Sequence, residues 1–116
     1  MALAQVGGQV YSNTALAETK AAAFAGRCLV FNILCFNPDA TATTYVQFFD
    51  VASGSVTVGT TTPTFVIPVG PKAGAVIALN CPRQFSTAVT VACTATATGS
   101  GAPGTAAVIS FDYVSG

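Results

Sequence analysis

The sequence predicts an all-β domain: an antiparallel β-sandwich, immunoglobulin-like or jelly-roll-like, with about seven or eight strands and an extended N-terminal arm. Valine, threonine, phenylalanine and isoleucine dominate its apolar segments, and glycine, proline and asparagine interrupt them at short intervals. Several segments alternate between apolar and polar residues, and no alternation of strand and helix patterns indicates a parallel α/β sheet. At 116 residues the chain has the size of one domain.

We expect residues 1–13 to form the N-terminal arm and residues 14–116 to form the sandwich. The arm precedes any clear core strand, yet it carries large apolar side chains that would be exposed to water without a packing partner. These residues are our candidates for contact with another subunit: Leu3, Val6, Val10 and Tyr11. The alternative is a tail that frays.

The alanine-rich segment 14–26 fits a first strand better than a helix, because it lacks a stripe of large apolar residues at helical spacing. Its alanine content and its Glu18/Lys20 pair leave a helix open. In the long apolar run 27–37, simple alternation predicts two covered faces. One face holds Leu29, Phe31, Ile33 and Cys35, and the other holds Val30, Leu34 and Phe36.

A turn at residues 37–40 separates this run from a strand at 43–51, in which Val46 and Phe48 point one way and Tyr45, Gln47 and Phe49 the other. Residues 52–63 are polar and read as a long connection between the two sheets. Pro68 makes residues 65–69 an edge strand, because proline cannot donate to a strand ladder. Further strands are expected at 75–80, 85–96 and 107–114.

The charge content is low, and it favours a chain that works inside an assembly. Only 7% of residues are charged, and four basic residues balance four acidic ones, so the formal net charge is zero. Near-zero net charge promotes association. The four basic residues are scattered, which argues against nucleic acid as a partner. No run approaches the ~20 apolar residues of a spanning helix, and no secretory signal is visible, so we expect neither a membrane nor export.

No residue pattern predicts catalysis, a metal site or a cofactor. The chain has no histidine, and its four cysteines form no C-x-x-C pair, so neither a nucleophilic triad nor a zinc site is expected. The four carboxylates are dispersed along the chain. We expect the cysteines to be reduced, buried and small hydrophobic residues, although spacing leaves a disulfide between distant cysteines open. The tyrosines Tyr11, Tyr45 and Tyr113 are weak candidates for a sugar-stacking platform.

Three stretches carry a resemblance to a known family. They are YVQFFDVA at 45–52, GTTTPTFVIPV at 59–69, and FSTAVTVACTAT at 85–96, the last followed by a glycine-rich loop and a strand that ends near Tyr113. In this order they resemble small β-sandwich domains of tailed-bacteriophage structural proteins, among them capsid decoration (cement) proteins. The resemblance covers roughly residues 25–114. It consists of strands and turns, and no functional residue carries over from it.

The resemblance implies a virion structural protein on the outer capsid surface, assembled in the host cytoplasm. Such a protein stabilises the capsid lattice by binding across neighbouring subunits of the major capsid protein, and the resemblance implies a homotrimer. The alternative is a tail or fibre β-sandwich module that binds a host-surface glycan, which requires aromatic and polar side chains gathered at exposed loop tips. We expect no enzymatic activity, because base, metal ligands and paired acids are all missing.

Overall fold

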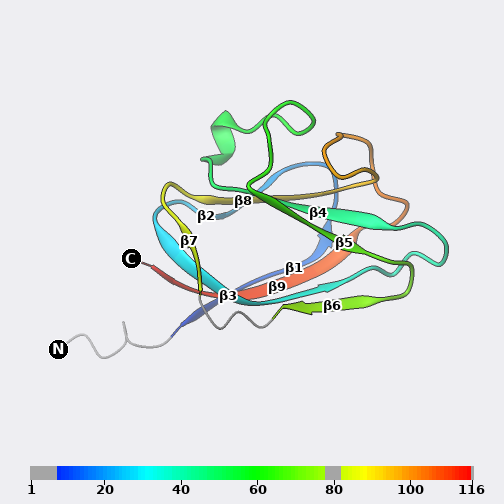
Figure 1. The fold of residues 1–116 in the computed structure, drawn as a ribbon, viewed down its shortest axis with the longest axis horizontal. Coiled ribbons are helices and arrows are strands. Elements are labelled where there is room, and N and C mark those ends of the chain that lie inside the picture. Colours follow the sequence, from blue (N-terminus) through cyan, green and yellow to red (C-terminus); the bar gives the residue numbers. More distant parts are fainter. Residues whose placement is uncertain (1–7, 78–81, 116) are drawn as a thin grey trace.

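A computed structural model describes residues 8–77 and 82–115, and these residues form a β-sandwich of two antiparallel sheets (Figure 1). Sheet A contains, in spatial order, β1 (Gln9–Leu16), β9 (Ala107–Ser115), β3 (Cys28–Phe36) and β6 (Gly74–Ile77), and β7 (Arg83–Phe85) also pairs with β3. Sheet B contains β2 (Ala21–Phe24), β8 (Val89–Thr94), β4 (Thr44–Phe49) and β5 (Phe65–Val69). The predicted fold class is confirmed, with nine strands in the described residues.

The first strand begins earlier than the sequence predicts. Residues 9–13, which we expected in the arm, form most of β1 and pair in register with β9, from Gln9 opposite Tyr113 to Asn13 opposite Ile109. The expected boundary between arm and sandwich at residues 13 and 14 is therefore wrong. Sequence spacing could not reveal this pairing, because it joins the two ends of the described chain. Segment 14–26 is the end of β1, a bend and β2, without a helix.

An extra residue in β3 changes which of its side chains face the core. Asn32 has a φ of +54°, and the pairing with β9 shifts by one residue between Phe31 and Leu34. Asparagine tolerates this left-handed backbone better than most residues, and its Nδ2 donates a hydrogen bond of 3.0 Å to Oδ2 of Asp112. Simple alternation across 27–37 is therefore wrong. The buried residues are Cys28, Val30, Ile33 and Cys35, while Leu29, Leu34 and Phe36 face outward.

The region 85–96, expected as one strand, is two strands that lie in different sheets. β7 belongs to sheet A and β8 to sheet B, and the chain crosses between them at Ser86 and Thr87. The Asp50 carboxylate holds this crossing: it accepts hydrogen bonds from the backbone N–H groups of Ser86, Thr87 and Ala88 at 2.9, 2.8 and 3.3 Å. Burial raises the pKa of the Asp50 carboxyl, but these three donors outweigh it and the net pKa is lowered.

Replacing Asp50 by alanine is expected to lower the free energy of unfolding by about 1–2 kcal/mol at neutral pH, because three backbone donors lose their charged acceptor at a partly exposed site. The pKa of this carboxyl is lower in the folded chain than in the unfolded chain. Its contribution is therefore present above about pH 4 and disappears as the pH falls through the folded value. Urea unfolding of the parent and of Asp50→Ala at neutral and acidic pH measures this difference. A difference that stays constant with pH would contradict the assignment.

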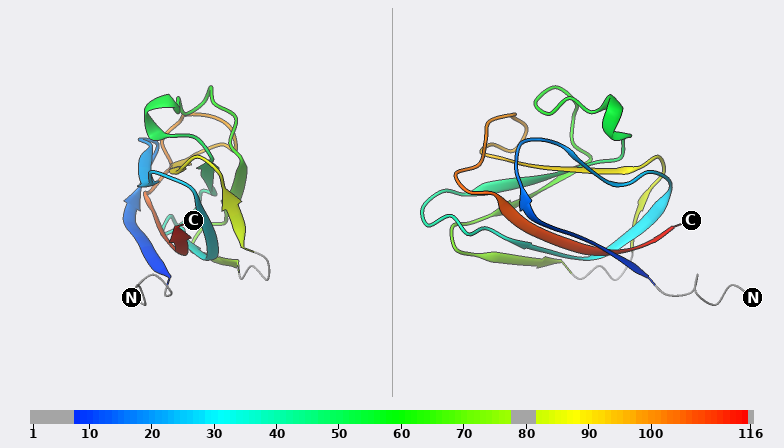
Figure 2. Two further views of the ribbon diagram at one scale, coloured as in Figure 1. Left: turned by 90° about the vertical axis from the view of Figure 1, so that its left-hand side faces the viewer. Right: turned by 180° about the vertical axis from the view of Figure 1, so that it is seen from behind.

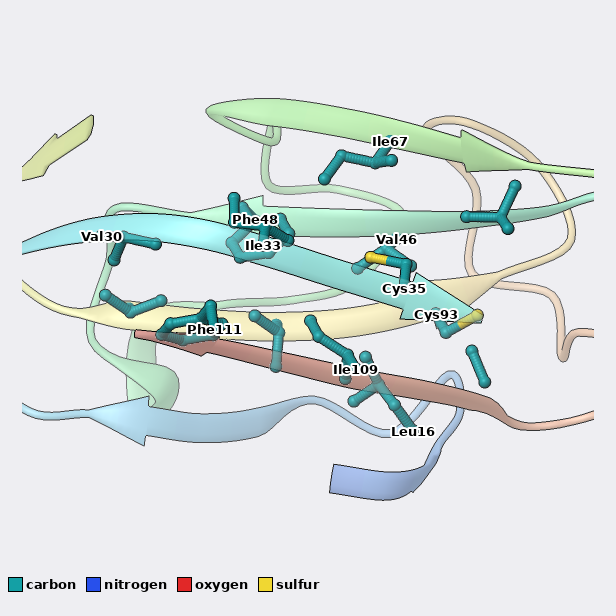
Figure 3. Close-up of a cluster of buried hydrophobic side chains, with 14 of the residues drawn as sticks. Leu16, Val30, Ile33, Cys35, Val46, Phe48, Ile67, Cys93, Ile109 and Phe111 are labelled. Atoms are coloured by element: carbon teal, nitrogen blue, oxygen red, sulfur yellow. The ribbon is translucent and has the colours of Figure 1, made fainter. Parts of the chain in front are cut away.

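The main core fills the space between the sheets, and both sheets contribute to it (Figure 3). In β4, Val46 and Phe48 point into this core, as predicted. In β9 the predicted alternation is also confirmed, with Ala107, Ile109 and Phe111 buried. β5 lies at the edge of sheet B, as Pro68 predicts. Fully buried aromatic rings form the centre: Phe48, Phe85 and Phe111, with Phe65 stacked on Phe48 at a centroid distance of 4.6 Å.

Candidate interaction surface

The described acidic residues take part in turns and strand contacts rather than in a common site. Among residues 8–77 and 82–115, no group of three or more histidine, cysteine, aspartate or glutamate side chains is placed to hold a metal ion. Asp39 accepts hydrogen bonds from the N–H groups of Thr41 and Ala42, which lower the pKa of its carboxyl. Asp112 accepts the bond from Asn32. These carboxylates stabilise the fold locally.

Three cysteines lie in the core as free thiols, which confirms the prediction for Cys28, Cys35 and Cys93; Cys81 lies outside the described residues. Burial raises the pKa of all three thiols. For Cys35, burial together with the nearby Cys93 raises the pKa to about 12. A thiol with a raised pKa is a poor nucleophile, because the thiolate is the reactive form.

Iodoacetamide at about pH 8 is therefore expected to leave Cys28, Cys35 and Cys93 unmodified in the folded protein and to alkylate them in denaturant. Mass spectrometry of the digested protein reads each site separately. Because the folded pKa of Cys35 lies above that of an unfolded thiol, its neutral form adds stability below about pH 8.5, and this stability is lost as the pH rises toward about 12. Equal labelling of Cys35 in folded and unfolded protein would contradict this prediction.

The outer face of sheet A is apolar. All five large hydrophobic residues that are exposed among the described residues lie on its strands: Val10, Leu29, Leu34, Phe36 and Val76. Residues opposite one another in an antiparallel ladder share a face. The ladders place Leu34 between Val76 and Ser110, and Phe36 beside Val108, so these side chains form one surface across β6, β3 and β9. We call it the sheet A outer face.

The most exposed part of this face is hollowed. A depression of about 240 Å³ lies between β6, β3 and β9, lined by Leu34, Phe36, Val76, Val108 and Ser110 together with the backbone beneath them. Val76 is 72% exposed and Leu34 is 47% exposed. Contiguous exposed apolar patches with a polar surround are typical of interaction sites.

Sheet B differs, because the chain itself covers its outer face. Residues 50–64 form the long connection from β4 to β5 and include the 3₁₀ helix η2 (Ser53–Ser55). We expected a connection between sheets, but it joins two neighbouring strands of sheet B (Figure 1). Its Val56 packs with Phe49 and Ala92 in a second buried cluster, and Lys20 donates a hydrogen bond to the Val56 carbonyl oxygen. Among the described residues, sheet A alone keeps an open apolar exterior.

A buried polar contact fixes a second loop over sheet B. Gln47, fully buried on the outer side of β4, donates from Nε2 to Thr94 Oγ1 at 2.7 Å and to the Gly99 carbonyl at 3.1 Å. The glycine-rich segment 99–104 is thereby held against the sheet. Figure 2 shows both loops on the same side of the sandwich, opposite the strands of sheet A.

The predicted contact residues have mixed outcomes. Val10 is 66% exposed on the sheet A outer face. Tyr11 is half-buried and faces the core, with its ring 5.3 Å from that of Phe111, so the structure assigns it to internal packing. Leu3 and Val6 lie outside the described residues. Leu34, Phe36 and Val76 were not among the predicted contact residues. Asn32, the one polar residue in the middle of an apolar run, was the available signal of a bulge that turns Leu34 and Phe36 outward.

The three tyrosines do not gather into one platform. Tyr11 and Tyr113 pack against the core from sheet A, and Tyr113 contacts Phe24 at a centroid distance of 5.1 Å. Tyr45 lies on sheet B. It shares a strand face with Gln47, two residues on, and that face points away from the core. Stacking on a sugar requires exposed rings on a shared surface, which these three do not provide.

No described helix has the length and apolarity to cross a membrane. Comparisons with protein-family models, with curated protein sequences and with solved structures found no match to this chain.

Proposed function

We propose that this chain is a structural protein of a bacteriophage virion. In this proposal it decorates the outer capsid surface and stabilises the lattice by binding across neighbouring major capsid subunits. The sheet A outer face carries the proposal, because it is the apolar surface that the described residues leave uncovered. The phage setting rests on the resemblance of segments 45–52, 59–69 and 85–96 to small β-sandwich domains of virion proteins.

The physical properties of this face suit a permanent protein contact. Interface centres are depleted in charge and enriched in apolar and aromatic side chains. The sheet A outer face has Leu34, Phe36 and Val76 near its centre, and its Asp112 is already bonded to Asn32. Covering apolar surface contributes about 25 cal/mol per Å² before the costs of association. Many copies on one shell add avidity.

The free buried thiols fit assembly in a reducing host cytoplasm, since this fold needs no disulfide in its described core. The homotrimer that the resemblance implies stays a prediction, as does the identity of the major capsid protein as partner. A zero net charge opposes neither self-association nor binding to a shell.

The copy number per particle tests the proposal. Virions purified from cells infected with the phage that encodes this chain are separated on a stained gel, and the band is quantified against the major capsid protein. A decoration protein is expected in hundreds of copies per particle, as order of magnitude, because avidity requires many sites on one shell. Its absence from the particles would overturn the proposal, and a handful of copies would favour the tail or fibre alternative.

A pair of matched variants tests the surface. Leu34→Glu with Val76→Glu places two carboxylates on the sheet A outer face, and burying them unpaired is costly. We expect at least about a tenfold loss of particle-bound protein, since each 1.4 kcal/mol is a factor of ten. The control, Ala52→Glu with Thr62→Glu, adds the same charge at exposed loop positions over sheet B and is expected to bind normally. Equal loss in both would show that charge alone matters.

A further inference from the structure

The first five residues of β1, Gln9–Asn13, form an open strand edge without charge, proline or a register shift. Exposed edges are commonly protected by proline, charge, bulges or short length. Among the described strands, β5 carries Pro68 at one border of sheet B, and β2 at the other has four residues and an irregular register after Ala22. β6 and β7 are four and three residues long. β1 has eight residues, QVYSNTAL, with neither charge nor proline. Its register with β9 shifts between Asn13 and Leu16 and is regular from Gln9 to Asn13.

The free side of β1 is accessible and held in an extended form. β1 is the border strand of sheet A, bonded to β9 on one side only (Figure 2). Gln9, Val10 and Ser12 are exposed, while the ring of Tyr11 anchors the strand on Phe111. The Ala15 N–H donates a hydrogen bond to Asn13 Oδ1, so this backbone donor near the end of the strand is already occupied. The stretch free to pair is therefore Gln9–Asn13.

We propose that two copies of this chain associate by antiparallel pairing of their β1 strands, which joins two copies of sheet A into one continuous sheet. The occupant is a second copy, because the edge is complementary to itself. An antiparallel pair has a two-fold axis, so the same strand supplies both sides of the contact. Like charges opposite one another destabilise such a pair, and β1 carries none. The zero net charge of the chain adds no repulsion between copies.

This pairing has a consequence for the sheet A outer face. The two-fold axis of an antiparallel pair is perpendicular to the sheet, so both outer faces point the same way. Val10, 66% exposed and opposite Asp112 of β9, then lies next to the joint. The dimer presents two copies of the sheet A outer face on one side.

The mass of the full-length protein in solution tests the pairing. Light scattering across a concentration series is expected to give twice the mass of one chain. Ser12→Lys places two lysines close together at the joint, and we expect it to give a monomer with an unchanged circular dichroism spectrum. The matched control Ser55→Lys, at an exposed position in η2 over sheet B, is expected to remain a dimer. Val10→Lys, at an exposed position in the same stretch, replaces Ser12→Lys should the latter fail to fold.

A parent chain that is monomeric at all concentrations overturns the pairing. A mass of three chains overturns it as well and favours the three-fold arrangement that the resemblance implies. A dimer that survives both Ser12→Lys and Val10→Lys places the contact elsewhere. These outcomes are separate from those of the proposed function: a monomer that decorates capsids contradicts only the pairing, and a dimer absent from particles contradicts only the capsid role.

Discussion

Phe48→Ala is expected to lower the free energy of unfolding by about 3–5 kcal/mol, because it opens a cavity where the two sheets meet. Phe48 of sheet B is fully buried, stacks on Phe65, and lies 5.9 Å from the ring of Phe111 in sheet A. Domains of this size have about 5–15 kcal/mol in total. The variant is therefore expected to lose about 10–20 °C in Tm, measured by thermal melting and urea titration.

Phe36→Ala is the matched control, since it removes the same kind of side chain from the outward side of sheet A. Phe36 is 42% exposed on the sheet A outer face, so its loss is expected to cost about 1 kcal/mol or less. A similar destabilisation from both variants would contradict the placement of the core. The melts are recorded at one protein concentration, because self-association shifts the apparent Tm.

Asn37→Ala is expected to lower the free energy of unfolding by about 3 kcal/mol, because one fully buried amide joins the turn at residues 37–42 to residues 69 and 70. Its Nδ2 donates to the carbonyl oxygens of Ala42 at 2.8 Å, Val69 at 3.0 Å and Gly70 at 3.2 Å. Its Oδ1 accepts from the Asp39 N–H at 3.0 Å. Alanine leaves these groups without their partner, in part away from water.

Urea unfolding measures the cost, and Asn32→Gly serves as the control. Asn32 is exposed, makes one bond to Asp112, and has a positive φ that glycine adopts without strain. Its replacement is expected to change the free energy of unfolding by less than about 1 kcal/mol. If Asn37→Ala costs no more than this control, the buried amide does not hold the loops together.

The sequence could predict a face wherever a strand alternates without interruption. β4 and β9 are such strands, and Phe48 and Phe111 were placed correctly from period two alone. The faces of β3 were predicted wrongly, because Asn32, with its left-handed backbone, shifts the second half of the strand by one position. Alternation of apolar and polar residues does not reveal the backbone conformation of a single residue. The pairing of β1 with β9 is non-local, so no short pattern announces it.

The bulge in β3 and the non-local pairing of β1 also explain why the sheet A outer face could not be predicted from the sequence. Val10 was predicted as a contact residue within an arm, and it lies, exposed, in a paired strand instead. Its contact with another subunit stays a prediction. Leu34 and Phe36 were expected to be covered, because a run that is apolar on both faces is usually buried on both. Which sheet the connection 50–64 covers depends on tertiary packing. Only the folded chain shows that it covers sheet B and leaves sheet A open.

The single additional residue in β3 has a consequence for the mutational tolerance of this strand. Deleting Asn32 would leave one residue between Phe31, opposite Asp112, and Leu34, opposite Ser110, as on β9. Ile33 and Cys35 would then still face the core, and Leu34 and Phe36 would still face outward. A deletion at this position is therefore expected to preserve the outer surface, whereas a deletion inside an uninterrupted strand exchanges its two faces.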